Sequence, residues 1–123
     1  MKHSLKILLV DDEQDFLNVL GILFEMDGAE TSFALNYSEA LEFLDKIDFD
    51  IVITDYRMPR MHGLYLLDMI KDKRPNMPVI IVSAYVDDKM REQARRKKAD
   101  LVLQKPFEYE YLLAGIRKLL KKK

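Results

Sequence analysis

The hydrophobic residues of this chain follow two alternating patterns: short continuous runs, and longer stretches spaced at helical intervals. The runs lie at residues 6–10, 31–34, 51–54, 79–82 and 101–103. Four of them are rich in Leu, Ile and Val, which is typical of parallel strands buried on both faces, while residues 31–34 favour a weaker strand. The runs therefore predict five strands.

The stretches that follow the strands predict five helices. In three of them the apolar residues are spaced to form one face, namely Phe16, Leu17, Leu20, Leu23 and Phe24, then Leu64, Leu67, Met69 and Ile70, and finally Leu112, Leu113, Ile116, Leu119 and Leu120. Asp27-Gly28 supplies the end of the first helix, and Pro75 ends the third.

The remaining two helices are identified by their caps. Asn36 and Glu39 form a capping box that opens a helix through Leu44. Asp87 or Asp88 can cap a helix over residues 89–97, whose only apolar residues are Met90 and Ala94. Because its apolar face is so small, we expect this fourth helix to pack poorly.

The regular alternation of strands and helices indicates the fold class. Five βα units in 123 residues predict an α/β fold, a doubly wound five-stranded parallel sheet of the flavodoxin-like (βα)5 type. The expected strand order is 2-1-3-4-5, in one domain covering residues 1–123. A barrel is excluded because it needs eight such units.

Composition and charge narrow the function classes. A hydrophobic content of 49% in 123 residues suffices for one core, and the absence of cysteine excludes disulfides and thiol chemistry. The formal net charge of -1 gives no overall field that favours nucleic acid or an anionic membrane. No apolar run is long enough for a membrane span or a signal peptide, so we interpret the chain as soluble and cytoplasmic.

Polar residues follow four of the predicted strands. Asp11 and Asp12 follow the first, Asp55 the third, Ser83 the fourth and Lys105 the fifth. In a parallel sheet these ends meet at one edge, where ligands bind. Taken singly, Asp55 could be a turn cap, Ser83 a strand-end hydroxyl and Lys105 a solvated lysine. Their joint placement favours a site for a cation and a phosphoryl group.

The crowding of three carboxylates predicts a cation. In the expected strand order the first and third strands are neighbours, so Asp11, Asp12 and Asp55 lie close together. Repulsion would raise their pKa values unless a divalent ion compensates the charge. Oxygen ligands without a nearby cysteine favour Mg²⁺, or Mn²⁺, over zinc.

At this point the chain resembles the receiver domain of two-component response regulators, including the chemotaxis regulators. The resemblance spans nearly all of the sequence and rests on four motifs in order: Asp11-Asp12, Asp55-Tyr56-Arg57-Met58-Pro59 with Met61 and Gly63, Ser83-Ala84, and Lys105-Pro106-Phe107. It implies that Asp55 accepts a phosphoryl group in a phosphorelay. It also implies that Lys105 and Ser83 bind phosphoryl oxygens, and that the Lys105-Pro106 peptide is cis.

The resemblance further implies a metal site and partners. Asp12, Asp55 and the carbonyl of Arg57 would bind Mg²⁺ directly, and Asp11 through water. The phosphoryl donor would be a histidine kinase or a phosphotransfer protein. A downstream protein would bind the surface of the fourth helix, fifth strand and fifth helix, and no direct contact with nucleic acid or membrane is expected.

Two other functions stay open at this stage. One is a Mg²⁺-dependent phosphohydrolase that turns over small phosphate esters through an aspartyl phosphate; it fits less well because Arg57 stands where a general acid is needed. The other is a degenerate receiver that binds partners constitutively. In the leading interpretation the chain is not an enzyme, since it catalyses only its own phosphorylation and dephosphorylation.

Three positions depart from the family pattern. Val102 replaces the aromatic residue three positions before the lysine, Lys98 replaces a glycine, and Ser83 replaces the usual threonine. Without the aromatic ring, we expect coupling to run through Ser83 and through Tyr85 or Phe107. Lys98 should lie at a helix C-terminus that glycine would suit better.

Several other conspicuous residues receive ordinary interpretations. We expect His62 to be exposed, His3 to be disordered, and Met58 and Met61 to pack within their loop. A basic cluster on the fourth helix is interpreted as a solvated face. It comprises Arg91, Arg95, Arg96, Lys97 and Lys98.

Overall fold

A computed structural model describes residues 4–58 and 61–121. Its parallel strands are β1 (Lys6–Val10), β2 (Glu30–Ala34), β3 (Ile51–Asp55), β6 (Val79–Ser83) and β7 (Leu101–Gln104). The helices are α1 (Gln14–Met26), α2 (Tyr37–Lys46), α3 (Gly63–Lys73), α4 (Asp88–Arg96) and α5 (Tyr109–Lys121). All ten predicted elements are therefore present, within two or three residues of their expected ends.

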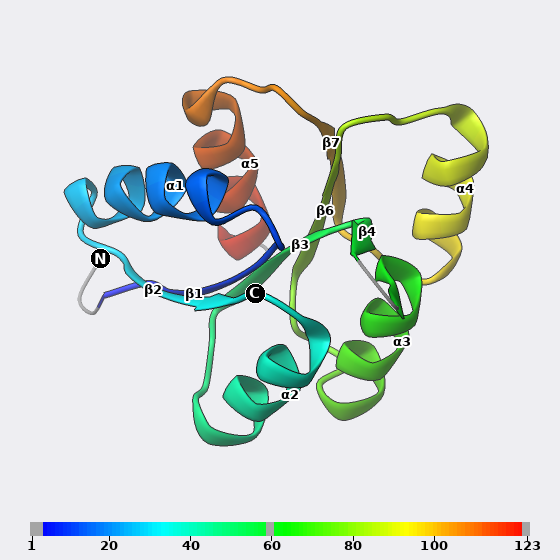
Figure 1. Cartoon of the computed structure of the whole chain (residues 1–123), viewed down its shortest axis with the longest axis horizontal. Helices are drawn as coiled ribbons and strands as arrows, with labels where there is room; N and C mark the ends of the chain where they lie inside the picture. The colour runs from blue at the N-terminus through cyan, green and yellow to red at the C-terminus, as the bar shows by residue number, and fades with distance from the viewer. Residues whose placement is uncertain (1–3, 59–60, 122–123) are drawn as a thin grey trace.

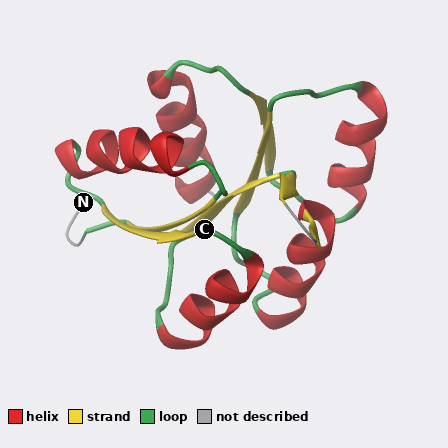
Figure 2. Cartoon of the chain, in the orientation of Figure 1, coloured by secondary structure: helices red, strands yellow, loops and turns green. Residues whose placement is uncertain are grey.

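The five strands form one parallel sheet in the order β2-β1-β3-β6-β7, which confirms the predicted order 2-1-3-4-5. Figure 1 shows α1 and α5 on one face of this sheet and α2, α3 and α4 on the other. Figure 2 shows the same sandwich, with the strands enclosed between helices. Because both faces are covered, successive strand residues enter opposite cores, as Leu8 and Leu9 do, and this explains the continuous apolar runs.

A short hairpin was not predicted. The loop after Asp55 contains β4 (Arg57–Met58) and β5 (Met61–His62), which pair antiparallel. Gly63 then begins α3 so close to the strand end that an added Cβ would lie 2.5 Å from the carbonyl oxygen of Tyr56. The sequence predicts only a loop here, because two-residue strands leave no periodic signal.

Helix α4 is anchored weakly, as predicted. Its buried residues are Met90 and Ala94, whereas α3 buries five residues. The side chain of Asp87 accepts a hydrogen bond from the amide of Met90 at 2.8 Å, which identifies Asp87 as the N-cap. Lys98 lies just beyond the helix with a φ of 70°, a conformation that costs a non-glycine residue about 1 kcal/mol.

The N-cap of α2 is the predicted residue, although the second half of the capping box differs. Asn36 caps α2 by accepting a hydrogen bond from the amide of Glu39, while the Glu39 carboxylate accepts from Leu35 rather than from Asn36. Within residues 4–58 and 61–121, the helices are too short or too polar to cross a bilayer. His3 and the side chain of Met61 lie outside the described residues.

Candidate functional site

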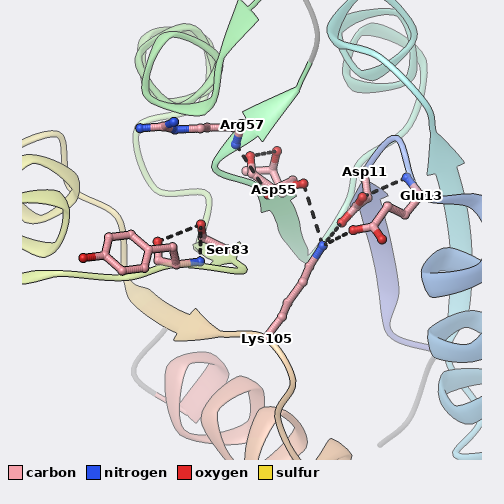
Figure 3. Close-up of polar contacts among 8 residues, drawn as sticks. Asp11, Glu13, Asp55, Arg57, Ser83 and Lys105 are labelled. Carbon is pink, nitrogen blue, oxygen red and sulfur yellow. Dashed lines mark hydrogen bonds and ion pairs between the residues drawn. The ribbon is translucent and has the colours of Figure 1, made fainter.

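The carboxyl ends of four strands place the predicted polar residues at one edge of the sheet. Asp11 follows β1, Asp55 ends β3, Ser83 ends β6 and Lys105 follows β7 (Figure 3). The strand register holds Asp55 beside Val82, so Ser83 lies one residue further along its own strand. Asp11, Asp55 and Ser83 are all buried, which is unusual for polar groups and marks this edge as a candidate site.

Three carboxylates gather there, as the sequence predicted. One oxygen each of Asp11, Asp12 and Asp55 lies within 4.8 Å of the others. Asp11 and Asp55 are buried, and Asp12 is exposed. A set of carboxylate oxygens converging at the end of a cleft is the chemistry that Mg²⁺ prefers, so these residues fit a divalent cation. Arg57 contributes to the same corner, where its amide donates a hydrogen bond to Asp55 at 3.4 Å.

Lys105 lies between the two buried carboxylates. Its Nζ is 2.7 Å from an Asp11 oxygen and 3.7 Å from an Asp55 oxygen (Figure 3). Two contacts that the sequence analysis missed complete its surroundings: Nζ donates to Glu13 at 3.1 Å and lies 4.2 Å from the ring centroid of Phe16. Lys105 is joined to Pro106 by a cis peptide bond, as expected.

The electrostatics of the site follow from this crowding. Burial and the charge of Asp11 raise the pKa of Asp55 to about 6, although Lys105 acts in the opposite direction. Burial likewise raises the pKa of Asp11, although the hydrogen bond from Lys105 acts to lower it. Burial alone would lower the pKa of Lys105, but its hydrogen bonds to the acids raise it overall. Within residues 4–58 and 61–121, three carboxylates therefore converge on a cluster whose ion pairs come from one ammonium group, that of Lys105.

Ser83 is turned toward its own loop. Its hydroxyl donates a hydrogen bond to the carbonyl of Tyr85 at 3.0 Å and accepts one from the Tyr85 amide at 3.3 Å. Figure 3 shows Ser83 to one side of the group formed by Asp11, Asp55 and Lys105. The sequence placed Ser83 at the correct edge but gave no indication of this local bond.

The cleft continues from Asp55 toward α4. It has a volume of about 590 Å³, and its walls include Tyr56, His62 and Gln93. The rings of Tyr56 and His62 meet edge to face at 4.4 Å, and the Tyr56 hydroxyl donates to Gln93 at 3.4 Å. His62 is exposed as predicted, yet its Nδ1 also caps α3 by accepting a hydrogen bond from Leu64. Neither the ring contact of His62 with Tyr56 nor its capping of α3 was predicted from the sequence.

Comparison with known proteins decides the family. A family model described as "Response regulator receiver domain" matches residues 7–117. The chain belongs to this family. The resemblance expected from the sequence is therefore confirmed. Receiver domains are phosphoacceptor modules of two-component signalling rather than enzymes in the usual sense.

Individual relatives agree with the family assignment. This receiver domain is 31% identical to sporulation initiation phosphotransferase F of Bacillus subtilis over 94% of the chain and 93% of the relative. A CheY-like receiver domain from Methanospirillum hungatei has a TM-score of 0.92 and 28% identity, covering 97% of this chain and 95% of the other. A response regulator from Burkholderia pseudomallei, with a phosphorylated aspartic acid and a calcium ion, has a TM-score of 0.88 and 25% identity, covering 97% and 70%.

Several other curated relatives are longer proteins. The receiver domain spans 42%, 25% and 51% of the length of three of them. Family membership therefore extends to the receiver fold and to phosphorylation-switched signalling.

The basic cluster and the Val102 position can now be located on the receiver domain. Arg95 and Arg96 both pair with Glu92 on the same helix, and Lys97 pairs with Asp68 of α3. Arg91 donates to the carbonyl of Val102, which is half-buried in β7. Met58 is buried, as expected of loop packing.

Proposed function

We propose that Asp55 is the phosphoryl acceptor of this receiver domain. The observation that carries the proposal is the placement of Asp55, which ends a central strand at the base of a cleft, next to two more carboxylates and an ammonium group. A carboxylate in this position can serve as an in-line nucleophile. The phosphorylated aspartic acid in the similar Burkholderia pseudomallei protein supports the same chemistry here.

The donor is a histidine kinase or a phosphotransfer protein. An oxygen of Asp55 attacks the phosphorus of the donor's phosphohistidine, the P–N bond breaks, and its electron pair returns to the histidine ring. Lys105 already lies 3.7 Å from Asp55 and needs only to turn from Asp11 to meet a phosphoryl oxygen. Ser83 reaches a second oxygen after releasing the carbonyl of Tyr85.

The acidic cluster is the proposed cation site. Asp12 and Asp55, with the carbonyl of Arg57, hold Mg²⁺ or Mn²⁺ directly, and Asp11 does so through water. The cation supplies positive charge beside the transferring phosphoryl group. This charge also compensates the excess of carboxylates, which would otherwise keep the pKa of Asp55 near 6 and part of this nucleophile protonated.

The proposed output surface consists of α4, β7 and α5.

Arg57, rather than an acid, stands two residues after Asp55, so the cleft offers no general acid there for the leaving group of a phosphate ester. We therefore infer that catalysis is limited to the domain's own phosphorylation and dephosphorylation, and that the modified state acts by changing its affinity for a downstream protein.

The test is incubation with acetyl phosphate and Mg²⁺, followed by intact-mass measurement. We expect one phosphoryl group on the wild-type chain and none after Asp55→Asn substitution or after chelation of the metal. Asp48→Asn is the matched control, because Asp48 precedes β3 and is exposed. Labelling that persists in Asp55→Asn would show that another residue is the acceptor.

A further inference from the structure

One buried hydroxyl is not explained by the site as described so far. Tyr37, the first residue of α2, is only 3% exposed. Its hydroxyl oxygen is sealed from solvent and has no hydrogen-bond partner within residues 4–58 and 61–121. Buried polar side-chain atoms nearly always have a partner, so an isolated one calls for an explanation, and a partner that engages it in another state of the molecule is one such explanation.

The position of Tyr37 suggests where that partner lies. Helix α2 begins three residues after β2, whose last residue, Ala34, accepts a hydrogen bond from the amide of Asp11 at 3.1 Å. The helix therefore starts at the same edge of the sheet as the acidic cluster. Burial, followed by the charges of Asp55 and Asp12, raises the pKa of Tyr37, so its hydroxyl stays protonated, and these two carboxylates are the acids whose charge acts on it.

The two carboxylates differ in their freedom to meet this hydroxyl. Asp55 is buried, and its side chain is already held by the amide of Arg57 and approached by Lys105. Asp12 is exposed, and its carboxylate accepts no hydrogen bond from the described part of the chain. The Tyr37 oxygen is sealed from bulk solvent. A protein group that can move onto it is therefore the acceptor to consider, and Asp12 meets this condition.

We propose that Tyr37 is a positioning residue of the cation site, whose hydroxyl donates a hydrogen bond to the Asp12 carboxylate when a divalent cation binds. The inference rests on the proposed cation site at Asp11, Asp12 and Asp55. A cation shared by these residues draws the exposed Asp12 inward, toward the start of α2. The hydroxyl then gains a partner that it lacks without the cation, and this difference between the two states strengthens cation binding.

The experiment compares Mg²⁺ binding by the wild-type chain, Tyr37→Phe and Tyr109→Phe, using calorimetric titration with MgCl₂. Phenylalanine keeps the ring contacts of Tyr37 and removes only the hydroxyl. We expect a dissociation constant about tenfold higher for Tyr37→Phe, in line with losses at residues that orient metal ligands. Tyr109 is the matched control, because its hydroxyl bonds Asp27 at the other end of α1; its substitution should change the constant less than about twofold.

Thermal unfolding without Mg²⁺ separates positioning from ordinary packing. Because the hydroxyl has no partner in that state, Tyr37→Phe should melt at the same temperature as wild type or higher, and Mg²⁺ should raise its melting temperature less. In the Asp12→Ala background, adding Tyr37→Phe should leave the residual Mg²⁺ affinity unchanged, since the acceptor is already gone.

Distinct outcomes overturn the two proposals. If the wild-type chain binds Mg²⁺ and Tyr37→Phe binds it equally well, the inference about Tyr37 is wrong while the cation site stands. The same conclusion follows if Tyr37→Phe is less stable without metal, or if it weakens binding in the Asp12→Ala background. If the wild-type chain does not bind Mg²⁺, the cation site itself is wrong, and the inference about Tyr37 is wrong with it.

Discussion

The two halves of the cleft are organised differently. In the charged half, Asp11, Asp55 and Lys105 are already within contact distance, and Lys105 also touches Glu13 and Phe16. In the hydroxyl half, Ser83 bonds its own loop, with its hydroxyl donating to the carbonyl of Tyr85 and accepting from the Tyr85 amide. One half is assembled before any phosphoryl group arrives, and the other must rearrange.

This difference matches the separate needs of the phosphoryl-transfer reaction and of the signal. Groups that attack or neutralise a phosphoryl group benefit from being fixed in advance, because reorganisation during the reaction raises the barrier. A signal, in contrast, requires two states that differ in energy by little. The loop after Ser83 leads directly into α4, which buries only Met90 and Ala94, so movement there costs few packing contacts.

The largest expected effect comes from breaking the charged half. Lys105→Met should destabilise the metal-free chain by about 3 kcal/mol at pH 8, because removing one partner of a buried ion pair leaves its charges uncompensated. Excess Mg²⁺ should recover part of this loss. Urea unfolding in EDTA and in Mg²⁺ measures both values, with Lys118→Met, an exposed lysine of α5, as the control. Equal stability of Lys105→Met and wild type in EDTA would contradict the assembled charged half.

A second prediction concerns pH. The pKa of Asp55 is raised from 3.8 to about 6 in the folded chain. The stability that its protonation contributes is therefore complete below about pH 4 and is lost as pH rises through 6. The metal-free chain should be more stable at pH 5 than at pH 7.5, with about 1 kcal/mol of the difference from this group.

Substitution assigns that pH dependence to a residue. In Asp55→Asn the unfolding free energy should change much less between pH 5 and pH 7.5. A smaller dependence on pH should remain, because the pKa of Asp11 is also raised. Asp48→Asn should behave like wild type. Denaturant unfolding across this pH range in EDTA provides the measurement, and a wild-type slope in Asp55→Asn would mean that Asp55 is not the titrating group.

The fold was predictable because its signals are local and repeated. Each buried strand, such as residues 51–54, is a continuous apolar run, and each helix has a cap or an apolar face. The strand order followed from counting βα units. The hairpin of β4 and β5 was missed because its four residues are too few to carry a period, and because the close approach of Gly63 to Tyr56 depends on tertiary contacts.

The site was predictable in its members but less so in its contacts. Asp11, Asp55, Ser83 and Lys105 end or follow strands, so topology alone collects them at one edge. Which groups touch is decided by side-chain geometry that no spacing encodes. Glu13 directly follows Asp11 and Asp12 in the sequence, so it could have been expected at the same edge as a partner for Lys105. The buried hydroxyl of Tyr37 gave no sequence signal, because tyrosine at the start of a helix is ordinary.

The smallest expected effect on stability, and the sharpest test of the comparison, lies in the hydroxyl half. Ser83→Ala removes one hydroxyl that bonds its own loop, so the unfolding free energy should change by about 1 kcal/mol or less. Its effect on signalling should be larger. A phosphoryl oxygen offers Ser83 a charge-assisted hydrogen bond that exists only in the modified state.

We expect that bond to draw in residues 84–86 and to shift α4 without rotation of an aromatic ring, since Val102 has none. Amide hydrogen exchange with and without beryllofluoride, a phosphoryl mimic, measures the response. Changes should concentrate at residues 84–99 in wild type and in the control Ser32→Ala, whose serine lies on β2, and should be lost in Ser83→Ala. Protection that changes only around Asp55 would mean that the hydroxyl half does not carry the signal toward α4.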